Sequence, residues 1–203
     1  MSLAWQPSLL GADEPEPSVD RAFGGLVRHQ LDAAAWVDHV PGWVRGQEAV
    51  FEQVFDKAQW THQTRRMYDK IVDQPRLHAT WKRSNGEPFL PIIAEMAAAL
   101  GERYGKQFTT GGLNLYRDGQ DSVAWHGDRI AKEIAEPVVG IVSLGHPRTF
   151  RLRPKGGGKS LPIVVHGGDL IVTGGTCQRT WEHAILKVKS AGPRISVTFR
   201  HTD

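Results

Sequence analysis

The chain has 203 residues, of which 40% are hydrophobic and 23% charged, an ordinary composition for a soluble globular protein with a full core. Its formal net charge of +3 is a mild basic bias, which permits a nucleic-acid partner without indicating one. The single cysteine, Cys177, excludes an intrachain disulfide, and no apolar stretch is long enough to span a bilayer. Residues 1–17 lack the basic and apolar regions of a signal peptide, so we expect a cytoplasmic protein, working as a monomer.

The first part of the chain mixes a polar lead, a strand and a helix. Residues 1–24 are rich in Pro, Asp, Glu and Gly, and we expect a flexible N-terminal lead there. Residues 29–40 favour a single strand followed by a Pro-Gly turn. Residues 47–60 carry apolar side chains at helical spacing, which predicts an amphipathic helix.

The rest of the chain is predicted to be mostly β structure with one further helix. Residues 64–81 favour strand structure broken by Pro75, and residues 90–104 predict a second helix with a proline near its start. From residue 109 onward, short apolar runs alternate with Gly, Pro and Asp turns, which is typical of an antiparallel sandwich or a jelly-roll barrel.

These elements predict an α+β fold without an interdomain linker. Its core is a double-stranded β-helix, or jelly roll, over residues 109–203. An N-terminal α/β extension with flanking helices, over residues 25–108, completes a single domain that spans residues 25–203.

Two histidines and one aspartate have the pattern of a metal centre. His126 and Asp128 are two residues apart, so on a strand they point to the same side, and His183 follows downstream. Two imidazoles and one carboxylate on one face of a metal leave positions open for a co-substrate and O₂, as in non-haem iron(II) oxygenases. We therefore predict that these three residues hold Fe(II); the alternative is a set of ordinary polar residues of the core or surface.

A strand expected near the C-terminus adds two fixed positive charges. Alternation gives it a polar face of Arg194, Ser196, Thr198 and Arg200 and an apolar face of Ile195, Val197 and Phe199. Asn114 and Tyr116 share one face of an earlier strand in the same way. A polar barrel interior is costly unless it binds something, and a guanidinium matches a carboxylate bidentately. These residues therefore favour a bound dicarboxylate over a surface strand with ion pairs.

Taken in chain order, these motifs resemble the AlkB family of Fe(II)- and 2-oxoglutarate-dependent dioxygenases. The matching residues are Asn114-x-Tyr116, His126-x-Asp128, His183 and Arg194-x-x-x-Thr198-x-Arg200. The HxD motif is common by chance, but the complete series in this order is specific. The resemblance implies Fe(II) on the three metal ligands, with 2-oxoglutarate and O₂ as co-substrates. It also implies that 2-oxoglutarate is bound by Asn114, Tyr116, Arg194, Ser196 and Arg200.

Members of that family mostly remove N-alkyl groups from nucleic-acid bases. The resemblance therefore implies a DNA-repair dioxygenase that demethylates N-alkylated bases in DNA or RNA and releases formaldehyde, succinate and CO₂. A base inside a duplex is out of reach, so the enzyme needs base flipping or a single-stranded substrate. We expect no catalytic residue beyond the metal ligands.

A segment of the first half is similar to the family's substrate-recognition region. Pro75-Arg76-Leu77 leads to Trp81, and Arg66 and Tyr68 precede it. The resemblance implies that the base stacks on Trp81 and that Arg66, Tyr68 and Arg76 contact the base or phosphates. The alternatives are a core position for Trp81 and a solvated basic strand edge around Arg66 and Tyr68.

Two positions depart from the family pattern. Ser196 stands where family members usually carry Asn, and Arg129 follows the HxD motif where repair members carry acidic residues that contact the base. We therefore expect an altered lesion preference. Two rival functions stay open, namely the same chemistry on a protein, lipid or small metabolite, and a non-catalytic β-barrel binding module.

Overall fold

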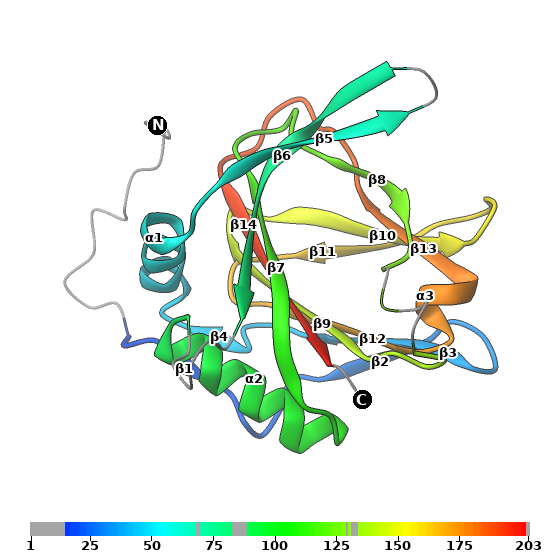
Figure 1. The fold of residues 1–203 in the computed structure, drawn as a ribbon. Helices are drawn as coiled ribbons and strands as arrows, with labels where there is room; N and C mark the ends of the chain where they lie inside the picture. The colour runs from blue at the N-terminus through cyan, green and yellow to red at the C-terminus, as the bar shows by residue number, and fades with distance from the viewer. Residues whose placement is uncertain (1–14, 68–69, 83–88, 129, 131–133, 202–203) are drawn as a thin grey trace.

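The computed structural model describes residues 15–67, 70–82, 89–128, 130 and 134–201 (Figure 1). Within this part of the chain, two antiparallel sheets dominate the fold. The eight-stranded sheet consists, in spatial order, of β2 (Val27–Gln30), β3 (Ala35–Val40), β12 (Leu170–Gly175), β9 (Val139–Gly145), β14 (Arg194–His201), β7 (Phe108–Tyr116), β6 (Lys70–Lys82) and β5 (Thr61–Met67). The four-stranded sheet consists of β11 (Leu161–Val165), β10 (Arg148–Pro154), β13 (Trp181–Ile185) and β8 (Val123–His126).

The order of the strands confirms the predicted double-stranded β-helix. From β7 onward the chain passes from the large sheet to the small sheet at β8, returns at β9, and crosses again at β10. It then returns to the large sheet at β12, crosses to the small sheet at β13 and ends in the large sheet at β14. This repeated crossing places strands that are distant in sequence next to one another, with β14 between β9 and β7.

Two helices cover one face of the large sheet. They are α1 (Gln47–Lys57) and α2 (Pro91–Tyr104), both close to their predicted positions. Their buried apolar side chains join one core cluster with Ile195, Val197 and Phe199, the face of β14 that was predicted to be apolar. Within the described residues, no helix is long and apolar enough to cross a membrane.

A second, smaller core lies between the two sheets. Its side chains come from both sheets, including Tyr116 of β7, Ile171 of β12 and Phe150 and Leu152 of β10. The interior of the double-stranded β-helix is thus apolar in part, and the polar site described below occupies the rest of it.

Three local predictions need correction. Residues 29–40 form the hairpin β2–β3 and not one strand, because Asp32 Oδ1 accepts the N–H groups of Ala34 (2.9 Å) and Ala35 (2.8 Å) and turns the chain. Pro75 does not break β6, since it falls where the pairing with β5 shifts register, and a missing N–H is tolerated there. The described end of the predicted flexible lead is held in place, because Phe23 is only 5% exposed and packs on Trp43.

Asp169, in the turn before β12, gives a pH-dependent test of this fold. Its buried carboxylate accepts the N–H groups of Gly42 (2.8 Å) and His166 (2.9 Å) and lies 3.0 Å from His39 Nε2. Burial by itself would raise the pKa of Asp169, but the hydrogen bonds with His39, Gly42 and His166 outweigh it and hold the pKa below 3.8. Because the folded-state pKa is lowered, this stabilisation is fully present above the pKa of the unfolded state, and it decreases as the pH falls from that value through the pKa of the folded state.

We predict that Asp169→Asn lowers the free energy of unfolding at pH 7 by about 1–3 kcal/mol, because it removes an ionised acceptor and leaves buried N–H groups poorly paired. Urea unfolding at pH 7 and near pH 3 measures the effect, and the gap between variant and wild type should narrow at the lower pH. Asp56→Asn, at an exposed position of α1, is the control. An equal gap at both pH values would contradict the prediction.

Candidate metal and co-substrate site

The small sheet brings two of the predicted metal ligands face to face. β13 pairs with β8 so that His183 lies directly opposite His126, and their ring centroids are 4.4 Å apart. His126 Nδ1 lies 2.8 Å from the carbonyl oxygen of Ala124, so Nδ1–H donates and Nε2 keeps its lone pair for a metal. Phe150 stacks on the ring of His183 at 5.1 Å and helps to bury it.

Both imidazoles are held in the neutral form. Burial lowers the pKa of His183 to about 3, and the neighbouring His126 acts in the same direction. Burial also lowers the pKa of His126, and the positive charge of Arg76 adds to this effect. Neutral imidazole is the form that binds metal ions, so the pair is prepared for coordination near neutral pH.

Asp128 is ionised and engaged by Arg200. The Arg200 side chain donates from Nε to both carboxylate oxygens (2.9 and 3.0 Å) and from Nη2 to one of them (2.7 Å). Burial by itself would raise the pKa of Asp128, but the hydrogen bonds and charge of Arg200 outweigh it, so the pKa is lowered. Two carboxylate oxygens offer about four lone-pair directions, which lets Asp128 pair with Arg200 and still offer a ligand atom.

The three predicted metal ligands are only partly gathered in this structure. Across the described ranges, no three His, Cys, Asp or Glu side chains are grouped closely enough to hold a metal ion by themselves. The two imidazoles face each other, whereas the carboxylate of Asp128 is turned toward Arg200. The donor set of two neutral imidazoles and one carboxylate nevertheless suits Fe(II).

Arg194 is a buried cation with an unpartnered donor. Its side chain is 2% exposed, Nε donates to Ser143 Oγ at 2.8 Å, and the guanidinium carbon lies 5.1 Å from the centre of the Tyr116 ring. Nη1 has no hydrogen-bond partner in the described part of the chain. Burial lowers the pKa of Arg194, which reflects the cost of holding this charge away from water. A carboxylate of a bound dicarboxylate would satisfy the donor.

Asn114 and Ser196 form a polar network next to Arg194. The β14–β7 register places Arg194 opposite Tyr116 and Ser196 opposite Asn114. Asn114 Nδ2 donates to Ser196 Oγ at 3.3 Å, and Asn114 Oδ1 accepts Arg76 Nε at 3.0 Å. The structure thus brings together four of the five residues predicted for the co-substrate. Arg200, the fifth, lies toward the other end of β14 against Asp128, and its contact with 2-oxoglutarate stays a prediction.

Trp81 is a core residue, so the predicted stacking platform is wrong. The side chain is 5% exposed, and its indole N–H donates to the carbonyl oxygen of Thr198 at 3.0 Å. Its ring packs on Phe199 at 5.1 Å between centroids. Gly111 allows this close approach, because a Cβ there would lie 2.4 Å from the indole nitrogen. No face of the ring is left for a base.

The structure places only some of the other residues that were predicted to contact the substrate. Arg76 lies in the site, where Nη1 donates to the carbonyl oxygen of Ser122 at 3.2 Å in addition to the Asn114 contact. Arg66 lies in β5, and Tyr68 falls outside the described residues. Their contacts with a nucleic acid stay predictions.

Sequence reasoning missed three residues that shape the site. Ser143 orients Arg194, His78 Nδ1 lies 3.3 Å from Asn114 Oδ1, and Gln178 accepts the backbone N–H of Asp128 at 2.7 Å. The alternation of side chains along the strand that carries Ser143 was a weak signal that this side chain points inward. No local sequence pattern marked His78 or Gln178.

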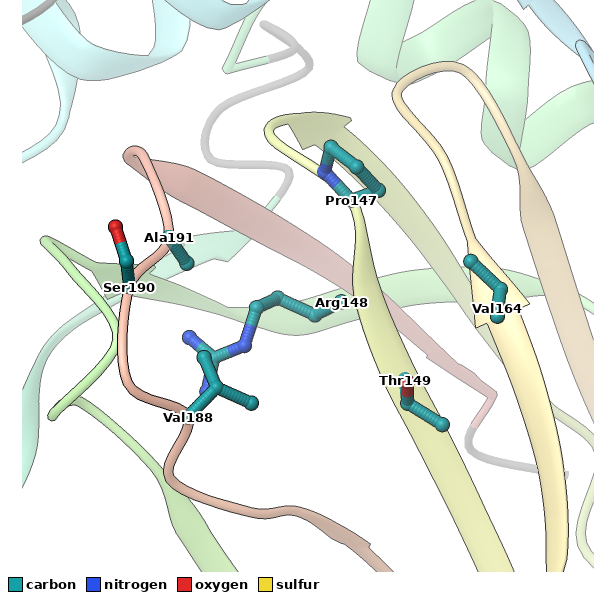
Figure 2. A pocket seen from close by; sticks show the side chains of 7 residues that line it. All are labelled: Pro147, Arg148, Thr149, Val164, Val188, Ser190 and Ala191. Atoms are coloured by element: carbon teal, nitrogen blue, oxygen red, sulfur yellow. The ribbon is translucent and has the colours of Figure 1, made fainter.

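A pocket of about 220 Å³ lies at one edge of the small sheet (Figure 2). It is lined by Pro147, Arg148, Thr149, Val164, Val188, Ser190 and Ala191. Arg148 is buried and donates to the carbonyl oxygens of Asp118, Asp121 and Leu186, so it ties two loops together. No metal-ligating side chain lines this pocket, which sets it apart from the site around His126 and His183.

The chain matches known proteins along most of its length. Residues 37–200 match the model of the 2OG-Fe(II) oxygenase superfamily. Alpha-ketoglutarate-dependent dioxygenase alkB homolog 3 of Mus musculus is 30% identical, over 96% of this chain and 76% of that protein, and the Homo sapiens protein is 31% identical over the same shares. DNA oxidative demethylase ALKBH2 of Arabidopsis thaliana is 28% identical, over 70% of this chain and 57% of its own.

The chain therefore belongs to the 2OG-Fe(II) oxygenase superfamily, and within it to the AlkB family. It is accordingly an enzyme of the iron(II)- and 2-oxoglutarate-dependent oxygenase class. The structure of OsALKBH1 shares the fold, with a TM-score of 0.59 at 13% identity, over 87% of this chain and all of the other. These findings confirm the sequence-based family assignment and fold class.

We predict that Arg194→Lys raises the Kd of 2-oxoglutarate about tenfold or more. A hydrogen bond to a charged group contributes about 1.5–3 kcal/mol, lysine lacks the planar fork, and ~1.4 kcal/mol corresponds to a factor of ten. Titration calorimetry on the metal-loaded protein measures the change. Arg151→Lys is the control. It makes the same substitution at an arginine of β10 and should leave the Kd of 2-oxoglutarate at the wild-type value. Unchanged affinity in the Arg194 variant would remove this residue from the co-substrate site.

We also predict that Trp81→Ala lowers the free energy of unfolding by about 3–5 kcal/mol, the usual loss when a buried Trp is truncated. Urea unfolding measures it. Trp81→Phe, which keeps an aromatic ring in the core, should lose less. A variant of wild-type stability that had lost only its turnover of methylated oligonucleotides would restore the stacking role.

Proposed function

We propose that the protein oxidatively demethylates N-alkylated bases in DNA or RNA and releases formaldehyde, succinate and CO₂. The observation that carries the proposal is the buried Arg194, whose unpartnered Nη1 suits a carboxylate of 2-oxoglutarate, in the same interior as the two facing imidazoles. The nucleic-acid substrate is supported by relatives that include a DNA oxidative demethylase.

In this proposal each polar residue of the interior has a separate task. His126, His183 and Asp128 hold Fe(II), which with 2-oxoglutarate and O₂ supplies the oxidation of the N-alkyl carbon. Arg200 keeps Asp128 ionised. Ser143 orients Arg194 so that its free N–H faces the co-substrate carboxylate.

The products follow from the chemistry of an N-hydroxymethyl group. Hydroxylation of an N-methyl carbon gives a hemiaminal, in which one carbon carries both the hydroxyl and the base nitrogen. The C–N bond then breaks, the hydroxyl hydrogen leaves as a proton, and the base nitrogen regains its electron pair. Formaldehyde and the unmodified base result. A paired base must first leave the duplex to reach the interior of the domain.

We further propose that the enzyme acts as a monomer in the cytoplasm. The proposal is consistent with the cysteine content, because a chain whose single cysteine is Cys177 cannot form an intrachain disulfide and so does not depend on an oxidising compartment. Light scattering of the purified protein tests the oligomeric state, and a dimer would contradict the proposal.

A formaldehyde-release assay tests the proposed reaction. Methylated single-stranded DNA, double-stranded DNA and RNA are each supplied with Fe(II) and 2-oxoglutarate. We predict that the wild type releases formaldehyde from at least one of them and that Asp128→Ala abolishes release, because it removes the carboxylate ligand. Asp56→Ala, which changes an exposed aspartate of α1, should behave as the wild type.

The same assay separates the rival functions. Consumption of 2-oxoglutarate without formaldehyde from any methylated nucleic acid would favour a protein, lipid or metabolite substrate. A protein that binds Fe(II) and 2-oxoglutarate but does not convert 2-oxoglutarate to succinate would favour the non-catalytic binding module. A steep loss of oligonucleotide affinity with salt would support the nucleic-acid reading, because phosphate contacts release counterions.

A further inference from the structure

The short helix α3 (Cys177–Thr180) connects the two segments that carry the metal ligands. It follows β12 and leads directly into β13, which carries His183. On its other side it contacts the segment around Asp128, where Gln178 accepts the backbone N–H of Asp128 at 2.7 Å. One turn of helix thus touches both parts of the metal site.

The amide of Gln178 is fixed at both ends. The side chain is 5% exposed, and its Nε2 donates to Thr173 Oγ1 at 2.7 Å. The Thr173 hydroxyl lies 3.5 Å from the carbonyl oxygen of Val139, which can only accept, so the hydroxyl donates there and accepts from Gln178. The backbone N–H of Asp128 can only donate, so the amide oxygen faces Asp128 and the amide nitrogen faces Thr173.

The backbone of α3 also shapes the turn between the metal ligands. A Cβ on Gly127 would lie 2.5 Å from the carbonyl oxygen of Gln178, so only glycine fits between His126 and Asp128. Beyond the turn, Arg179 donates from Nε to the carbonyl oxygen of Ala135 at 2.8 Å. The helix therefore holds the chain on both sides of Asp128.

We propose that Gln178 is a positioning residue for the metal centre. Its amide oxygen sets the peptide plane at Asp128, and that plane decides where the carboxylate points relative to His126 and His183. Groups that orient metal ligands in this way typically change metal affinity about 10- to 100-fold when they are removed. The inference rests on the iron site of the proposed function but not on its nucleic-acid substrate.

The test compares metal binding by four forms of the full chain. Gln178→Met keeps the length of the side chain and removes the hydrogen bond to Asp128. Thr173→Val keeps that bond but removes the acceptor that orients the amide. Gln53→Met makes the same chemical change at an exposed position of α1 and is the matched control. Titration of each metal-free protein with Co(II) gives a Kd and the visible spectrum of the bound ion, and urea unfolding gives the stability without metal.

We expect Gln178→Met to raise the Kd of Co(II) about tenfold or more and to change the Co(II) spectrum, as removal of an orienting partner does. Thr173→Val should show a smaller increase, and Gln53→Met should match the wild type. A purely structural role would change the unfolding midpoint and leave the Kd and spectrum of the folded protein unchanged.

Wild-type Kd and spectrum in folded Gln178→Met would overturn the inference while leaving the proposed function intact. If that variant does not fold, Thr173→Val decides in the same way, and an unchanged Kd there overturns the inference. Absence of Co(II) binding by the wild type would overturn both the inference and the iron site of the proposed function.

Discussion

Side chains along β14 alternate between an apolar face that packs under two helices and a polar face that points into the interior. Ile195, Val197 and Phe199 are fully buried in the core beneath α1 and α2, which fixes the register of this central strand. Given that register, Arg194 must face the interior opposite Tyr116. A slip by one residue would exchange the two faces and bury the arginines in the apolar core, so the packing of the helices enforces the polar site.

The two arginines of β14 have different partners in the interior. Arg200 is satisfied within the protein, because its fork is taken by the carboxylate of Asp128. Arg194 donates from Nε to the hydroxyl of Ser143 and lies beside Tyr116, its Nη1 has no hydrogen-bond partner among the described residues, and burial lowers its pKa. The first arginine thus has its charge partner within the protein, whereas the second keeps an N–H that the carboxylate of a ligand would satisfy. Binding of a dicarboxylate should therefore stabilise the folded protein, since the ligand prefers the folded state.

The sequence predicted the parts of the site that follow from local periodicity. The shared face of Arg194 and Ser196 and the two imidazoles of His126 and His183 could be placed from strand alternation and motif order. The position of Trp81 could not be predicted in this way, because an aromatic residue beside a basic segment is equally consistent with a core position and with a stacking surface. Only the path of β6 along β7, which brings the indole to the backbone of Thr198, decides between them.

Contacts between distant segments account for what sequence reasoning missed. The pairing of Asp128 with Arg200 joins residues 72 positions apart, and the contact of Gln178 with Asp128 joins residues 50 apart. Neither has a spacing that a periodic pattern could reveal. The turn at Asp32 was a missed local signal, since an aspartate before small residues is a common turn former.

A polar network around Asn114 of β7 links the neighbouring strands β6 and β14. Arg76 lies in β6, whose hairpin with β5 extends beyond the body of the domain (Figure 1). Its guanidinium donates to Asn114, which in turn donates to Ser196 on β14, two residues from Arg194. A shift of β6 at Arg76 would therefore be transmitted by hydrogen bonds to Asn114 and Ser196. The proposed function assigns Asn114 and Ser196 to 2-oxoglutarate and Arg76 to the nucleic acid, so under that proposal a single amide side chain would connect the two sets of contacts.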